Sequence, residues 1–154
     1  MPEHRVIWGG HPSITPLLYY VMEKLEMDIQ NHLRLYQSLF FKDKFPVDNN
    51  KFDNVVLTEN KGDIHSSVME LRRRIFSDNR FDAGIFIGGM EGIEVEFKML
   101  KEYHPNAIIL PIASTGAATK IVYDTLFDEN LKNERFVKDY GYASIFQKFL
   151  IDRI

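Results

Sequence analysis

Short runs of apolar residues alternate along this chain with longer segments whose apolar residues recur every three or four positions. The short runs are typical of buried strands, and the longer segments are typical of helices that pack by one face. The expected strands cover residues 5–8, 33–41, 54–58, 83–87 and 107–112. The expected helices cover residues 14–28, 63–78, 91–103, 115–126 and 142–154. This order predicts a Rossmann-like, doubly wound α/β fold with a mostly parallel five-stranded sheet and helices on both faces.

The same periodicity predicts which residues face the core. The first helix is expected to turn five residues inward: Leu17, Leu18, Val21, Met22 and Leu25. The second is expected to bury Val68, Leu71, Ile75 and Phe76. The last helix carries an apolar set that is either core or an exposed interface: Tyr142, Ile145, Phe146, Phe149 and Leu150.

The length of 154 residues suits one domain, and no Pro/Gly/Ser-rich linker interrupts it, so we expect a single domain over residues 1–154. A net charge of -3 argues against a nucleic-acid partner, which usually selects a basic face. No apolar run reaches about 18 residues, so no membrane span is expected. The absence of cysteine excludes disulfides and thiol nucleophiles and fits a reducing compartment, so we expect a cytoplasmic protein.

Three of the expected strands end in loops of small residues that lead directly into helices. These loops are 9–13, 88–92 and 113–119. A helix start offers unpaired backbone N–H groups, and glycine lets the backbone approach an anion closely. Because carboxyl ends of parallel strands meet at one edge of a sheet, we expect one phosphate cradle. Its expected ligand-binding residues are Gly9, Gly10, His11, Ser13, Gly88, Gly89, Met90, Glu91, Gly92, Ser114, Thr115 and Gly116.

Charged residues near these loops suggest further ligand contacts. Glu94 or Glu96 is expected to accept hydrogen bonds from ribose hydroxyls or to act as a general base, although acids in a first helical turn also complement the helix dipole. One of the arginines in the run 72–74, Arg72 or Arg73, is expected to reach a phosphate. Lys120 is a weaker candidate of the same kind. The scattered histidines have no metal-ligand spacing, so we expect no metal and no cofactor.

Several segments of the chain resemble those of a known family. The segments 6–14 and 88–97, and the final strand with residues 114–116, resemble the strand ends of the SLOG superfamily, Rossmann-like domains related to the LOG phosphoribohydrolases. The segment 69–73 is similar to the M-x-x-R-K helix of those enzymes, which implies that Arg72 contacts phosphoribose. The glycine segment that begins at Ile87 departs from the enzymes' P-G-G-x-G-T-x-x-E pattern in three ways. Ile87 replaces the proline, Met90-Glu91 spans two positions where the enzymes have one, and Ile93 replaces the threonine. These departures favour the sensor branch.

The resemblance implies a function as well as a fold. Sensor SLOG domains occur in bacterial antiviral defence systems, linked to TIR or Sir2-type NADase effectors. A domain of this kind would recognise a phosphoribosyl nucleotide derived from NAD, such as ADP-ribose or a cyclic ADP-ribose isomer, and would form homo-oligomers with an effector as partner. The alternative is an enzyme, a nucleoside 5'-monophosphate phosphoribohydrolase with Glu94, Glu96 and Arg72 in its active site. A third hypothesis is an assembly domain whose loops only turn the chain.

Overall fold

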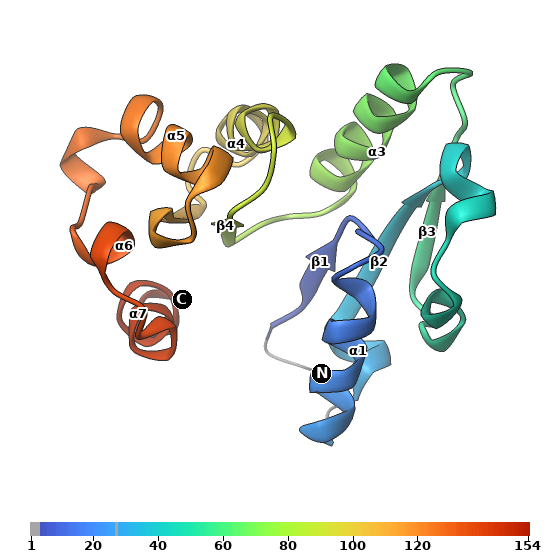
Figure 1. The fold of residues 1–154 in the computed structure, drawn as a ribbon, viewed down its shortest axis with the longest axis horizontal. Helices are drawn as coiled ribbons and strands as arrows, with labels where there is room; N and C mark the ends of the chain where they lie inside the picture. The colour runs from blue at the N-terminus through green and yellow to red at the C-terminus, as the bar shows by residue number, and fades with distance from the viewer. Residues whose placement is uncertain (1–3, 27) are drawn as a thin grey trace. The chain divides into compact units, whose positions relative to one another are not determined.

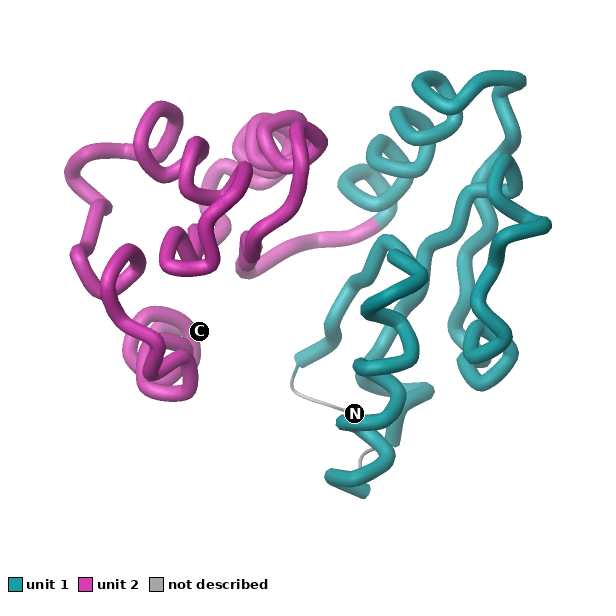
Figure 2. The backbone as a smooth tube through the Cα atoms, in the orientation of Figure 1, with its two compact units in different colours: residues 1–78 teal, residues 79–154 magenta. Residues whose placement is uncertain are grey.

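The computed structural model describes residues 4–26 and 28–154 of the chain. The chain divides into two compact units, which we call the N-terminal unit (Met1–Asp78) and the C-terminal unit (Asn79–Ile154). Figure 1 shows the elements of each unit, and Figure 2 shows the division along the backbone. Each unit contains its own parallel sheet, so each is described in turn.

The N-terminal unit is built on a three-stranded parallel sheet in the order β1-β2-β3. The strands are β1 (Val6–Trp8), β2 (Leu33–Ser38) and β3 (Val55–Thr58). Val6 pairs with Leu33 at one end of the β1–β2 ladder, and Ser38 pairs with Thr58 at the end of the β2–β3 ladder. All three strands therefore end at the same edge of the sheet, where a parallel sheet presents its loops.

Helices of the N-terminal unit pack against this sheet. They are α1 (Thr15–Lys24), α2 (Ile29–His32) and α3 (Ile64–Asp78). Met22 of α1 joins Leu33, Leu35 and Phe52 in a buried cluster. Side chains alternate along a strand, so Tyr36, which is 1% exposed, faces the opposite side from Leu35. The helix α3 contacts both β2 and β3.

The first helix differs from its prediction in length and in its buried face. It ends at Lys24, and Glu26 has a φ of 53°, a left-handed conformation that stops a helix. Residue 27, within the predicted span, lies outside the described residues. The predicted inward set is wrong in part, because Leu17, Val21 and Leu25 are exposed. Met22 is buried, as predicted, and Thr15 is buried as well, because the helix turns that side toward the sheet.

The C-terminal unit is built on a parallel pair of strands, β4 (Ala83–Ile87) and β5 (Ile108–Ile112), paired from Ala83–Ile108 to Ile87–Ile112. Its helices are α4 (Gly92–Tyr103), α5 (Ala117–Thr125), α6 (Arg135–Lys138) and α7 (Tyr142–Phe149). The helices α5 and α6 pack against β5, and α5 also packs against α4. The connection from each strand to the next helix is short, so the strand ends and helix starts lie close together.

Aromatic side chains fill much of the C-terminal unit. The rings of Tyr123 and Phe127 stack at 5.9 Å between centroids, and Phe136 meets both rings edge-on. Phe149 of α7 lies 4.9 Å from the Phe136 ring. Ile145 is fully buried. Of the two alternatives left open for the last helix, core or exposed interface, Ile145 and Phe149 therefore pack in the core of the unit.

The prediction of a mixed α/β architecture with parallel strands is confirmed, but the prediction of a single five-stranded sheet is wrong. All five strands exist, and they are divided into sheets of three and two. An apolar run predicts that a segment is a strand, but it carries no information about which strand becomes its neighbour. The second strand also ends at Ser38 rather than at residue 41. The Ser38 hydroxyl accepts a hydrogen bond from the Phe40 amide and starts a 3₁₀ segment, Leu39–Lys44.

Three other differences concern local structure. The 3₁₀ turn Val47–Lys51 and the short helices α2 and α6 were not expected. The last helix ends at Phe149 and is followed by the 3₁₀ turn Ile151–Arg153.

Within residues 4–26 and 28–154, no helix has the length and apolarity that crossing a membrane requires. The single-domain organisation stays a prediction.

Candidate functional site

The loop that follows β4, residues 88–92, is exposed at its centre, and we call it the Gly88–Gly92 loop. Gly88 and Gly89 have φ values of 55° and 83°, in the left-handed region that favours glycine. A Cβ atom at Gly89 would lie 2.3 Å from the Ile93 Cγ1 atom, so any side chain there would force Ile93 to move. The tight turn brings the end of β4 directly to the start of α4.

The loop 113–119 after β5 holds the Gly88–Gly92 loop in place. The Gly88 amide donates to the Thr115 hydroxyl oxygen at 2.8 Å, and that hydroxyl donates to the Ile112 carbonyl at 2.5 Å. The Gly88 carbonyl accepts from both the Thr119 amide, at 3.0 Å, and the Thr119 hydroxyl, at 2.9 Å. The Ala118 amide donates to the Gly89 carbonyl at 3.3 Å. The ends of β4 and β5 are therefore joined by four hydrogen bonds, and the bond from Thr115 to Ile112 fixes the Thr115 side chain.

These bonds change the role expected for the start of α5. The sequence suggests that its first amides face an anion, but those of Ala118 and Thr119 are already donated to the neighbouring loop. Gly116 and Ala117 have φ values of 73° and 51°, which turn the chain sharply into α5. Ser114 has a buried hydroxyl oxygen with no hydrogen-bond partner among the described residues. The structure therefore places Thr115 as a support for the Gly88–Gly92 loop.

The Gly88–Gly92 loop keeps a run of backbone donors. Among the described residues, no protein acceptor is bonded to the amides of Gly89, Met90, Glu91 and Gly92. The next two amides, of Ile93 and Glu94, donate to the carbonyls of Met90 and Glu91 within the first turn of α4. Four successive donors at a helix start suit a phosphate oxygen.

Two acidic residues lie beside these donors. Glu91 precedes α4 and is exposed, while Glu94 in the first turn is half-buried. Glu96 is also half-buried, but it lies about 200° further around the helix, so it does not share a face with Glu94. A carboxylate accepts hydrogen bonds from hydroxyl groups and repels phosphates, so these acids add both acceptors and negative charge to the start of α4.

The N-terminal unit contains the remaining predicted residues, and its first loop is closed on itself. The His11 carbonyl accepts from the amides of Ile14 and Thr15, both at 3.0 Å, and the His11 Nδ1 atom accepts from the Ser13 amide at 3.2 Å. Gly10 has a φ of 73°, and its carbonyl accepts from the buried Gln37 side chain at 2.9 Å. The first amides of this helix region are therefore used within the loop.

The arginines of α3 have partners on the same helix. Arg73 binds Glu70 with both its Nε atom, at 2.9 Å, and its Nη2 atom, at 2.7 Å. Arg74 binds Asp78 at 2.6 Å. Arg72 is half-buried, and its Nη1 atom lies 3.9 Å from the Met69 sulfur. Lys120, on α5 in the C-terminal unit, binds both carboxylate oxygens of Asp124.

The Arg73–Glu70 pair gives a testable pH effect. Its hydrogen bonds hold the pKa of the Glu70 carboxyl below its ordinary value, although burial acts in the opposite direction. A lowered folded-state pKa stabilises the fold at neutral pH, and this contribution is lost as pH falls through the carboxyl's titration. We expect Arg73→Ala to raise the pKa of Glu70, as measured by NMR titration of its carboxyl carbon. Arg74→Ala, whose partner is Asp78, should change the pKa of Glu70 far less. An unchanged value in Arg73→Ala would show that the pair does not persist in solution.

Two supporting residues were not predicted from the sequence. Gln37 and Thr119 are buried polar residues, and each donates to the carbonyl of a positive-φ glycine. Gln37 gives a usable signal, because it is a polar residue that follows the apolar pair Leu35-Tyr36 near the end of β2. Thr119 gives a weaker one, because threonine is common in a first helical turn. Among the described residues, no group of three or more histidine, aspartate or glutamate side chains is placed to hold a metal ion.

Parallel strands that lead through short glycine loops into helices define this chain as a Rossmann-like α/β protein. The chain belongs to the SLOG cluster3 family, whose model matches residues 1–150. This membership places it among the nucleotide-related domains of the LOG-like superfamily. No curated protein and no solved structure matches the chain.

Proposed function

We propose that this protein is a nucleotide sensor whose Gly88–Gly92 loop binds a phosphate of a phosphoribosyl nucleotide. The observation that carries the proposal is the run of four backbone amides, from Gly89 to Gly92, that no acceptor of the described chain uses. Backbone N–H groups at a helix start form strong hydrogen bonds with anionic oxygens. Family membership supports a nucleotide as the source of that anion.

Glu94 supplies the second element of recognition in this proposal. It lies one turn into α4, so its carboxylate is close to the loop that would hold the phosphate. A charged acceptor binds a ribose hydroxyl more strongly than a neutral one does. The preferred ligand class is therefore a ribose 5'-phosphate derivative, such as ADP-ribose or a cyclic ADP-ribose isomer. The role that follows is regulation of a bacterial defence effector, such as a TIR-type NADase, by an NAD-derived signal.

The first experiment is thermal unfolding of the protein with AMP, ADP-ribose, NAD and cyclic ADP-ribose. A ligand present at about 100 times its Kd should stabilise the protein by roughly 2.7 kcal/mol, which raises Tm by several degrees. Chromatography of the same mixtures shows whether a free base is released. Stabilisation without release supports a sensor, whereas release that is lost in Glu94→Gln supports a phosphoribohydrolase. No shift with any of the four compounds would contradict the proposal.

A matched pair of variants tests the recognition of ribose. Glu94→Gln should weaken binding of ADP-ribose about tenfold, because a charge-assisted hydrogen bond becomes a neutral one. Glu91→Gln removes the same charge from the neighbouring turn and should leave binding equal or slightly tighter, because it relieves repulsion of the phosphate. Isothermal titration calorimetry gives both values. Equal effects of the two variants would rule out a specific role for Glu94.

A further inference from the structure

The Gly88 peptide groups are held on both sides by threonine side chains. The Gly88 amide is bonded to the Thr115 hydroxyl and the Gly88 carbonyl to the Thr119 hydroxyl. Thr119 is fully buried, and its own amide donates to the same carbonyl. Thr115 and Thr119 lie one helical turn apart in sequence, so their hydroxyls reach the two sides of one residue. We call Thr115, Thr119 and these bonds the threonine clamp.

Such a clamp matters because of the glycines that it holds. Gly88 and Gly89 are free to adopt many backbone conformations, and each alternative conformation would turn the following amides in another direction. Fixing both peptide groups of Gly88 and the carbonyl of Gly89 restricts the loop before any ligand arrives. A ligand then loses less conformational entropy on binding, because the donors are already aligned.

We propose that Thr119, with Thr115, is a positioning residue that holds the amides of the Gly88–Gly92 loop in their anion-binding arrangement. This inference rests on the proposed function, and it assigns the loop after β5 to preorganisation of the site rather than to ligand contact. Neither threonine hydroxyl needs to touch the ligand for its loss to weaken binding.

The test compares three variants on α5. Thr119→Val keeps the shape of the side chain and removes the hydroxyl, while Thr119→Ser keeps the hydroxyl. Thr125→Val is the matched control, because the Thr125 hydroxyl donates to the Ile121 carbonyl of its own helix and is remote from Gly88 in sequence. The Kd of ADP-ribose is measured by calorimetry at a temperature where all variants are folded, together with hydrogen exchange of the Gly88 amide in the free protein.

We expect Thr119→Val to raise the Kd about tenfold and to speed exchange at Gly88, whereas Thr119→Ser and Thr125→Val stay within about twofold of the wild type. Faster exchange with an unchanged Kd would overturn the positioning role while leaving nucleotide binding intact. Unchanged exchange and unchanged Kd in Thr119→Val would overturn the clamp itself. A wild type that binds neither ADP-ribose nor the other three nucleotides would overturn the proposed function and with it this inference.

Discussion

Replacement of Phe97 by alanine is expected to lower the free energy of unfolding of the C-terminal unit by about 3–5 kcal/mol. Phe97 lies on α4 and is 2% exposed. Its ring centroid is 5.7 Å from that of Phe86 on β4, at an interplanar angle of 60°. Truncation would remove this edge contact and leave a cavity between the helix and the strand that together carry the Gly88–Gly92 loop. Urea denaturation followed by circular dichroism measures the change.

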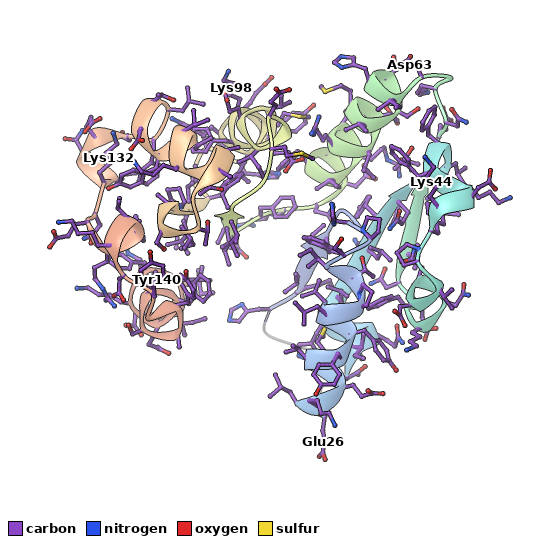
Figure 3. The ribbon with its side chains drawn as sticks, viewed as in Figure 1. Glu26, Lys44, Asp63, Lys98, Lys132 and Tyr140 are labelled. Atoms are coloured by element: carbon purple, nitrogen blue, oxygen red, sulfur yellow. The ribbon has the colours of Figure 1, made fainter. Side chains whose placement is uncertain are left out.

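The adjacent residue provides the control for Phe97. Lys98, labelled in Figure 3, is exposed on the same helix, so Lys98→Ala should change stability by no more than about 0.5 kcal/mol. Both substitutions place alanine, a strong helix former, on α4, so helix propensity does not explain a difference between them. A loss below about 1 kcal/mol in Phe97→Ala would contradict the packing described for this unit.

A second large effect is expected at Gly10, where alanine should lower stability by about 2–4 kcal/mol. The φ of 73° is unfavourable for a residue with a side chain. An added Cβ atom would lie 1.9 Å from the Gln37 Nε2 atom and 3.0 Å from the Tyr36 carbonyl oxygen. Gln37 is buried, so moving it away would break its hydrogen bond to the Gly10 carbonyl and leave polar atoms unsatisfied.

Gly62 separates the two contributions at Gly10. It has a φ of 92° in the same unit, but no atom lies within 4 Å of the position of an added Cβ. Gly62→Ala should therefore lose only about 1 kcal/mol, the conformational part of the effect. In a double-mutant cycle, Gly10→Ala combined with Gln37→Ala should destabilise less than the sum of the two single changes, because both remove the same contact. Additive effects would argue against a clash with Gln37.

Local elements were largely predictable because each depends on neighbouring residues. The apolar runs at 83–87 and 108–112 form strands, and the segments 64–78 and 92–103 form helices close to the predicted limits. The division into two sheets was not predictable, because strand pairing depends on residues far apart in the sequence. The exposed face of α1 was missed for a similar reason: Leu17 and Val21 have the spacing of a core face, but the sheet contacts the side that carries Met22.

The candidate site shows the same division between local and distant information. The pair Gly88-Gly89 after an apolar run indicates a tight loop, and both residues have a positive φ in the structure. Whether an amide at a helix start can bind a ligand depends on whether a carbonyl from another part of the chain already accepts its hydrogen bond. The start of α5 looks like an anion site in sequence, but the carbonyls of Gly88 and Gly89 accept its amides. The start of α1 likewise has its amides capped by His11, which no spacing rule indicates.

Every ladder in the structure joins strands that are consecutive in the chain: β1 with β2, β2 with β3, and β4 with β5. Synthesis runs from the N-terminus, so all three strands of the first sheet leave the ribosome before β4 does. The first sheet can therefore form all of its inter-strand pairings during synthesis, because none of its strands pairs with β4 or β5. Short sequence separation between paired strands also reduces the entropy lost on closing each loop, which favours rapid folding of the nascent chain.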